Sequence, residues 1–139
     1  MVELISGRKG KGKTKYLLDE ANKKVVDATG TIVYLDKSSK HMYELNNKVR
    51  LINVFDYKLD SCDAFIGFLC GVTSQDHDLT HIYIDSFLKL AHLEDTDITI
   101  VIEKLEELSN MFHVDFTISI SLDNVDLPEA IRQKVIIAL

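Results

Sequence analysis

The sequence predicts an α/β fold, a three-layer α/β/α sandwich in which helices cover both faces of a mainly parallel β-sheet. Short apolar runs typical of buried strands alternate with segments whose apolar residues recur at helical spacing, as in parallel strands joined by crossover helices. The chain has 139 residues, 46% of them hydrophobic, which is enough for a core that needs no disulfide or metal. We therefore expect residues 1–139 to form a single domain.

The first half of the chain is expected to supply three strands and one long helix. The apolar run at residues 2–6 and the β-branched run at residues 31–36 read as strands, with a helix between them at residues 13–26. Its buried face is expected to be formed by Tyr16, Leu17, Ala21 and Val25, which recur at helical spacing. A short helix at residues 42–46 and an edge strand at residues 50–55 follow, the edge position being inferred from a short pattern with polar flanks.

The next predicted element is a short helix at residues 64–70. Asp60 or Ser61 is a suitable N-cap, and Gly71 is a suitable C-cap because a residue without Cβ adopts the left-handed conformation freely. Residues 72–79 are then expected to form a loop.

The rest of the chain is expected to alternate strands with helices. Residues 80–85 and 114–121 read as strands, and a helix begins near Ser86 after the first of them. A strongly periodic helix is predicted at residues 97–111, with an apolar stripe formed by Ile98, Val101, Ile102, Leu105 and Leu108. A last helix is predicted at residues 129–138, directly after the only proline, since proline is favoured in the first turn of a helix.

A glycine-rich loop links the first predicted strand to the first predicted helix. Residues 7–14 read G-R-K-G-K-G-K-T and fit the pattern G-x-x-x-x-G-K-[ST] at every fixed position. The glycines, which allow positive φ and close approach of the backbone to a polyphosphate, are Gly7, Gly10 and Gly12. Lys13 is expected to reach the outer phosphates and to be solvent-facing without ligand, and the Thr14 hydroxyl is placed to ligate Mg²⁺.

Positive charge is concentrated around this loop. Residues 1–24 carry seven Lys and Arg against three Asp and Glu, whereas residues 25–139 carry nine against nineteen, within a net charge of −6. The basic residues expected to face the phosphates are Arg8, Lys9, Lys11, Lys13 and Lys15. Nucleic-acid binding is unsupported, because the chain has neither a second basic stripe nor aromatic residues interleaved with cations.

A second motif ends in an aspartate. Residues 80–86 read T-H-I-Y-I-D-S, which places Asp85 at the carboxyl end of a predicted strand, where open α/β sheets bind their ligands. This segment resembles a Walker B motif. Asp85 is therefore expected to hold Mg²⁺ together with Thr14, through a hydrogen bond from Thr14 or from a water on the metal.

Over most of its length the chain resembles the P-loop NTPase superfamily, on the strength of residues 7–14 and 80–86. The strand at residues 31–36 and the one that follows Asp85 are similar to those of the recombinase-like (ASCE) division, in which a strand lies between the phosphate-loop strand and its neighbour. The chain also looks like a group of short bacterial ATP-binding proteins, some labelled as twitching-motility ATPases. The resemblance implies a P-loop NTPase-like fold with ATP and Mg²⁺ as its ligands.

Two departures from these families concern catalysis. Ser86 follows Asp85 where many ATPases have a glutamate, and the sequence Asp36-Lys37-Ser38-Ser39 follows the second strand where recombinase-like members have one. The catalytic candidates are then Lys13 and Asp36, and the alternative for Asp36 is an ordinary strand-end residue. We accordingly expect ATP hydrolysis that is slow or depends on a partner.

Two further functions stay open at this point. A small-molecule or nucleoside kinase is one alternative, although such enzymes usually cover their phosphates with several arginines and this chain has three, Arg8, Arg50 and Arg132. A non-catalytic nucleotide-sensing module is the other. Turnover that depends on an acceptor would indicate a kinase, and binding without turnover would indicate a sensor. A motor or switch ATPase should change its assembly state with nucleotide.

Composition also bears on location and partners. Cys62 and Cys70 lack the spacing of a metal site, no segment has the length of a membrane span, and no signal peptide is recognisable. We expect a cytoplasmic protein that does not bind membranes. The predicted helix at residues 129–138 has more apolar residues than one packing face uses, which suggests a homo-oligomer formed through that helix.

Overall fold

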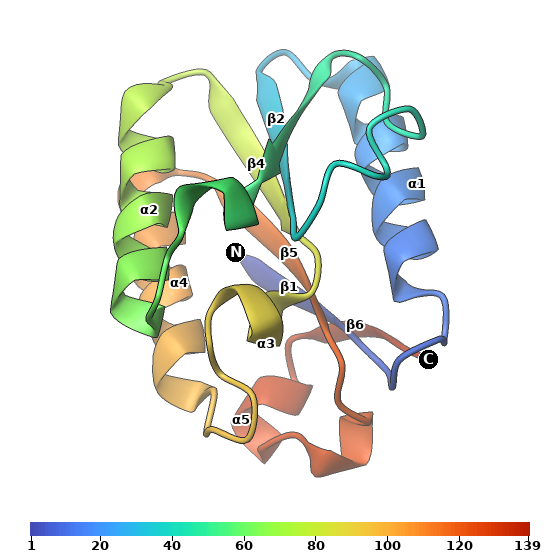
Figure 1. Ribbon diagram of the computed structural model, residues 1–139, viewed down its shortest axis with the longest axis vertical. Helices are drawn as coiled ribbons and strands as arrows, with labels where there is room; N and C mark the ends of the chain where they lie inside the picture. The colour runs from blue at the N-terminus through green and yellow to red at the C-terminus, as the bar shows by residue number, and fades with distance from the viewer.

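The computed structural model describes all residues, 1–139, and contains one six-stranded, all-parallel sheet (Figure 1). The strand order is β3-β2-β4-β5-β1-β6. The strands are β1 (Val2–Ser6), β2 (Thr31–Asp36), β3 (Val49–Asn53), β4 (Leu79–Ile84), β5 (Asp115–Ile120) and β6 (Val135–Ala138). The predicted α/β class and the parallel sheet are confirmed, and β3 is an edge strand as expected.

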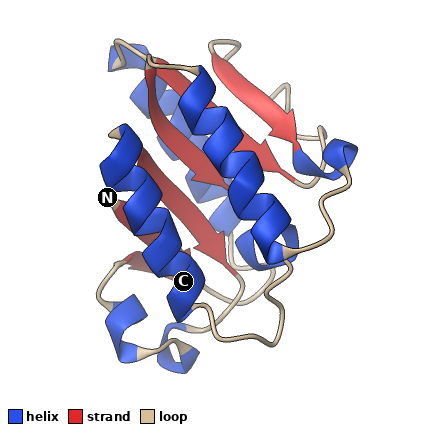
Figure 2. Ribbon diagram, turned by 90° about the vertical axis from the view of Figure 1, so that its left-hand side faces the viewer, coloured by secondary structure: helices blue, strands red, loops and turns tan.

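Helices cover both faces of this sheet, which makes the fold a three-layer sandwich. They are α1 (Lys13–Asp27), α2 (Cys62–Gln75), α3 (Phe87–Leu90), α4 (Thr99–Phe112) and α5 (Glu129–Arg132). In Figure 1, α1 lies on one side of the sheet and α2 and α4 lie together on the other, and Figure 2 shows this second side face-on. No helix combines the length and the apolar character needed to cross a membrane.

Two separate apolar cores follow from the two covered faces. Along β2, Ile32 and Tyr34 belong to the core beneath α1, whereas Val33 and Leu35 belong to the larger core beneath α2 and α4. Side chains of a strand alternate between its two faces, so a strand buried on both faces needs a continuous apolar run. This explains why residues 31–36 could be recognised as a strand from composition alone.

The sheet topology brings the ends of three further strands to the edge where β1 leads into the glycine-rich loop. β5 lies between β1 and β4, pairing Ser6 of β1 with Ile120 and Ile84 of β4 with Ile118. β2 lies on the other side of β4. The carboxyl ends of β1, β5, β4 and β2 therefore line one edge of the sheet, because all four run parallel.

The predicted helix at residues 129–138 is wrong over most of its length. α5 ends at Arg132, and the V-I-I-A segment forms β6, which pairs with β1. All three residues at 135–137 are β-branched, which favours a strand. The free edge of β1 offers backbone partners, and Leu4 N–H donates to Lys134 O at 2.9 Å. The helix through which a homo-oligomer was expected is therefore absent.

Two shorter predictions also need correction. α2 continues through Gly71 to Gln75, so Gly71 is no C-cap and the expected loop at residues 72–79 begins four residues late. Residues 42–46 form turns instead of a helix, because their backbone groups bond to Asn22 of α1: Asn22 Nδ2 donates to Glu44 O at 2.8 Å, and Asn46 N–H donates to Asn22 Oδ1 at 2.7 Å.

Candidate functional site

The glycine-rich loop connects the end of β1 to the start of α1, as the motif predicts. Gly10 and Gly12 have φ of 81° and 94°, a left-handed conformation that other residues adopt only at a cost. Gly7 is needed for a different reason, since a Cβ at this position would lie 3.1 Å from both the Cβ and the carbonyl oxygen of Leu139. The loop therefore takes its shape from glycine at all three places.

Lys13 is buried, contrary to the expectation of a solvent-facing side chain. Lys13 is only 7% exposed, and its Nζ donates hydrogen bonds to Gly7 O at 2.6 Å and to Arg8 O at 2.9 Å. Burial lowers the pKa of the Lys13 ammonium, and the negative charge of Asp85 partly raises it. The ammonium is thus satisfied by carbonyl groups of its own loop, with which a phosphate would have to compete.

Asp85 lies at the end of β4, and both neighbouring strands hold it. Its Oδ1 accepts hydrogen bonds from Ser119 Oγ at 2.8 Å and from Ser86 N–H at 2.9 Å. Its Oδ2 accepts one from Tyr34 Oη at 3.1 Å. Asp85 is 4% exposed, so these three donors stabilise a carboxylate that would otherwise be buried at a high cost.

Neither Tyr34 nor Ser119 was predicted from the sequence to belong to the site. Tyr34 follows the apolar pattern of β2 and reads as a core residue, and its ring is indeed fully buried. Its hydroxyl reaches Asp85 only because β2 and β4 are neighbours, which pairs Tyr34 with Tyr83. One feature of the sequence could have indicated these two residues: each places a hydroxyl near the carboxyl end of a buried strand, where the hydroxyl needs a hydrogen-bond partner.

Asp36, the candidate catalytic base, is also buried at the end of a strand. It is 2% exposed; its Oδ1 accepts a hydrogen bond from Lys37 N–H at 2.7 Å, and its Oδ2 is buried without a partner. Burial raises the pKa of Asp36, the Lys37 hydrogen bond lowers it, and the charge of Asp85 raises it further. The Asp36 carboxylate is therefore shielded from solvent.

A polar cavity of about 360 Å³ unites the loop with Asp85. No hydrophobic residue lines it. The lining residues are Lys9, Gly10, Gly12, Lys13, Thr14, Lys37, Asp85, Ser86, Ser119 and Ser121. The structure thus gathers most of the predicted site residues around one hollow, at the carboxyl edge of the sheet.

Three of the predicted basic residues lie outside this cavity. Arg8 is exposed, with Nε 3.8 Å from Asp123 Oδ2, and Lys11 is exposed in the loop. Lys15 lines a neighbouring cavity of about 450 Å³, which also includes Thr14 and lies between α1 and the turn at His41 and Glu44. A third cavity, of about 240 Å³, adjoins this polar cavity, called the phosphate cavity below for the ligand that the motif predicts, and shares Lys9, Lys37, Ser86 and Ser121 with it.

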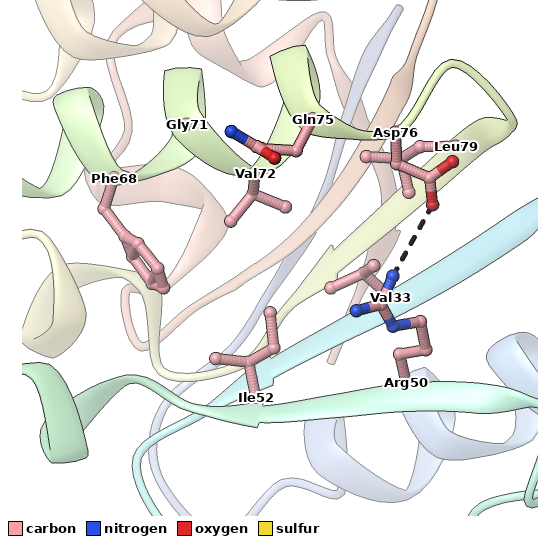
Figure 3. A pocket seen from close by; sticks show the side chains of 9 residues that line it. All are labelled: Val33, Arg50, Ile52, Phe68, Gly71, Val72, Gln75, Asp76 and Leu79. Atoms are coloured by element: carbon pink, nitrogen blue, oxygen red, sulfur yellow. Dashed lines mark ion pairs between the residues drawn. The ribbon is translucent and has the colours of Figure 1, made fainter.

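The largest cavity, about 600 Å³, lies away from the loop (Figure 3). It lies between β2, β3 and α2 and has a mainly apolar lining, with Val33, Ile52, Phe68, Val72 and Leu79. Arg50 pairs there with Asp76, at 3.6 Å between Nη1 and Oδ2. Arg50 is therefore engaged at a distant surface, and Arg132 is exposed on α5.

No protein-family model matches the chain, and no curated protein has a significant match to it.

Proposed function

We propose that the protein binds ATP with Mg²⁺ through residues 7–14 and Asp85, and that it hydrolyses ATP slowly or only with a partner. The observation that supports this most directly is the single polar cavity lined by Lys13, Thr14 and Asp85. A P-loop NTPase needs these three groups around one ligand, and they come from segments about seventy residues apart in the chain. The position of β5 between β1 and β4 agrees with the recombinase-like arrangement.

The start of α1 is well suited to an anion. Its N-cap is Gly12, which makes no side-chain cap hydrogen bond, and its first turn contains no acidic residue. The first backbone N–H groups of the helix therefore have no side-chain acceptor, and the helix dipole of this 15-residue helix favours negative charge at the same end. Phosphate oxygens would supply the missing acceptors.

The donors present fit magnesium bound together with nucleotide phosphates. Mg²⁺ prefers oxygen ligands and usually binds to one or two protein groups plus phosphates and waters. Thr14 and Asp85 offer a hydroxyl and a carboxylate at the same cavity, and no group of three or more His, Cys, Asp or Glu side chains forms a metal cage elsewhere in the chain. Bound there, Mg²⁺ would neutralise charge on the β and γ phosphates.

Space for the rest of a nucleotide lies next to the phosphate cavity. The cavity of about 450 Å³ beside α1 shares Thr14 with it and is lined by both apolar and polar groups, among them Leu18, Asp19 and Glu44. A base and ribose could occupy it while the phosphates lie on the loop. This favours a nucleotide over inorganic phosphate or pyrophosphate as the ligand.

Slow hydrolysis follows from the carboxylates at the site. Asp85 is the only carboxylate that lines the phosphate cavity, and its oxygens already accept three hydrogen bonds from the protein. Residues that bind the ground state and the transition state equally do not raise the rate. A group that orients the attacking water would have to come from a partner or from a rearrangement of Asp36.

A small-molecule kinase is the second candidate. The observation that favours it is the cavity of about 240 Å³ that shares four residues with the phosphate cavity, because a phosphoryl acceptor needs space beside the terminal phosphate. A nucleotide sensor would bind ATP at the same loop without turnover.

The decisive experiment is a calorimetric titration of ATP with and without Mg²⁺. We expect the wild type to bind ATP, and Lys13→Ala and Thr14→Ala each to weaken binding about tenfold or more, since a charge-assisted hydrogen bond contributes about 1.5–3 kcal/mol. Lys40→Ala is the matched control, an exposed lysine of the β2–β3 connection outside the cavity. Unchanged affinity in a folded Lys13→Ala protein, with folding checked by circular dichroism, would contradict the phosphate-loop assignment.

A further inference from the structure

We propose that the cavity of about 240 Å³ beside the phosphate cavity binds a small hydroxylated anion, a compact molecule with a phosphate or carboxylate group and free hydroxyls. Three lysines line this cavity: Lys9 from the phosphate loop, Lys37 from the segment after β2, and Lys89 from α3. Two carboxylates, Glu94 and Asp95 of the α3–α4 connection, line it as well. Segments distant in the sequence thus bring five ionisable groups around one small hollow.

The three lysines have no partner within the protein. None of their ammonium groups takes part in the ion pairs or side-chain hydrogen bonds of the structure, whereas Lys15, Lys104 and Lys134 each pair with a carboxylate. The three lysines outnumber the two carboxylates of the cavity, and an anion between the lysines would relieve the repulsion among them. Lys37 and Lys89 are moreover partly buried, so an anion would be partly shielded from water there.

The two carboxylates indicate what else the ligand has. Neither Glu94 nor Asp95 lies within ion-pair distance of a lysine, so both keep oxygens able to accept hydrogen bonds. Hydroxyl groups of a ligand are suitable donors to them, while the anionic group of the same ligand meets the lysines. A purely anionic molecule would leave these acceptors unused, and a neutral polyol would leave the lysines unpaired.

The position of this cavity connects the inference to nucleotide binding. Lys9, Lys37, Ser86 and Ser121 line both cavities, so a bound molecule would lie beside the phosphates of a nucleotide. This placement rests on the proposed function, but the cavity and its lysines do not. Of the three lysines, only Lys89 lines the cavity of about 240 Å³ without also lining the phosphate cavity. A substitution of Lys89 therefore tests the smaller cavity separately from the phosphate cavity.

The test is calorimetric titration with glycerol 3-phosphate and, separately, with glycerate, on protein saturated with Mg²⁺ and a non-hydrolysable ATP analogue. The analogue fills the phosphate loop, so further binding must occur elsewhere. We expect one of the two probes to bind the wild type, and which one binds distinguishes a phosphate ligand from a carboxylate ligand. Lys89→Gln should weaken that binding about tenfold and leave the affinity for the analogue unchanged, whereas Lys40→Gln should alter neither.

Two results would overturn the proposal: no binding of either probe, or equal binding by Lys89→Gln and Lys40→Gln. Failure of the proposed function gives a different pattern, in which the ATP analogue does not bind the wild type. In that case the same two probes are titrated onto the nucleotide-free protein. Dependence of their binding on Lys89 then still supports the cavity, and its absence rejects it.

Discussion

At the scale of single residues, the Tyr34 hydroxyl helps to orient the Asp85 carboxylate. Burial raises the pKa of Tyr34 far above its usual range, and Asp85 raises it further, so the phenol remains a hydrogen-bond donor at any physiological pH. Its hydrogen bond directs one oxygen of Asp85, and Ser119 directs the other. Tyr34 is thus a positioning residue for the proposed metal ligand.

We expect Tyr34→Phe to weaken ATP binding about threefold to tenfold when Mg²⁺ is present and to leave binding in EDTA unchanged, because a hydrogen bond contributes about 0.5–1.5 kcal/mol. Tyr83→Phe is a matched control. The Tyr83 ring stacks on that of Tyr34 with centroids 6.4 Å apart, and its hydroxyl makes no hydrogen bond to the protein. Equal behaviour of the two variants in calorimetry would show that Asp85 needs no such orientation.

The Asp36 carboxyl gives a prediction about rate. Since its Oδ2 is buried and its Oδ1 is bonded to Lys37 N–H, we expect Asp36→Asn to leave the residual ATPase rate unchanged. The wild-type rate itself should lie well below the ~1–100 s⁻¹ typical of kinases. A loss of rate in Asp36→Asn with ATP affinity intact would identify Asp36 as the base. Phosphate release at tens per second from the wild type alone would show that the protein already contains an effective base.

At the scale of elements, α2 shows what a glycine means in context. Gly71 lies in the interior of a helix that begins at the Ser61 cap, where Ser61 Oγ accepts a hydrogen bond from Ala64 N–H at 3.0 Å. Its φ is not positive, and a Cβ at this position would meet no atom within 4 Å. The residue therefore has neither the conformation nor the crowding that requires glycine.

Gly71→Ala should therefore stabilise the protein by about 0.5–1 kcal/mol, measured by chemical denaturation, because alanine loses less conformational entropy in a helix. A C-cap glycine would give the opposite sign. Gly12→Ala provides the contrast, since Gly12 has φ of 94° and alanine would be strained there. Destabilisation by Gly71→Ala would mean that α2 ends at residue 70, as the sequence suggested.

At the scale of the whole molecule, His81 makes stability depend on pH. It is 6% exposed, its Nε2 lies 2.8 Å from Thr117 Oγ1, and its ring stacks on Tyr83. Burial and the charge of Lys24 lower its pKa to about 4, against about 6.5 in an unfolded chain. Between these values the unfolded state binds more protons, so stability is full above pH 6.5 and falls as pH approaches 4.

We expect the free energy of unfolding to drop by about 2–3 kcal/mol more in the wild type than in His81→Gln when pH is lowered from 7 to 4.5. The comparison with His81→Gln is needed because carboxylates also titrate in this range, and they are common to both proteins. Parallel curves for the two proteins would show that His81 is solvated in the folded state.

Most of the fold could be predicted because local patterns and tertiary structure agree. Residues 7–14 need no distant partner to form a strand-loop-helix turn, β2 is apolar on both faces, and β5 alternates apolar with polar residues. β6 could not be predicted, since its V-I-I-A segment suits a helix or a strand and only the free edge of β1 decides between them. The contact of Tyr34 with Asp85 likewise joins residues far apart in the chain, and the contacts of Lys13, although local, depend on the exact conformation of the loop.

The intervening strand β5 also determines what can lie between the phosphate loop and Asp85. Neighbouring strands are about 4.8 Å apart, so β1 and β4, separated by β5, have axes about 10 Å apart. No hydrogen bond joins Thr14 to Asp85, and Lys13 makes no ion pair with Asp85. The loop side and the Asp85 side of the site are thus not bonded to each other directly, and under the proposed function a hydrated Mg²⁺ ion above β5 would connect them.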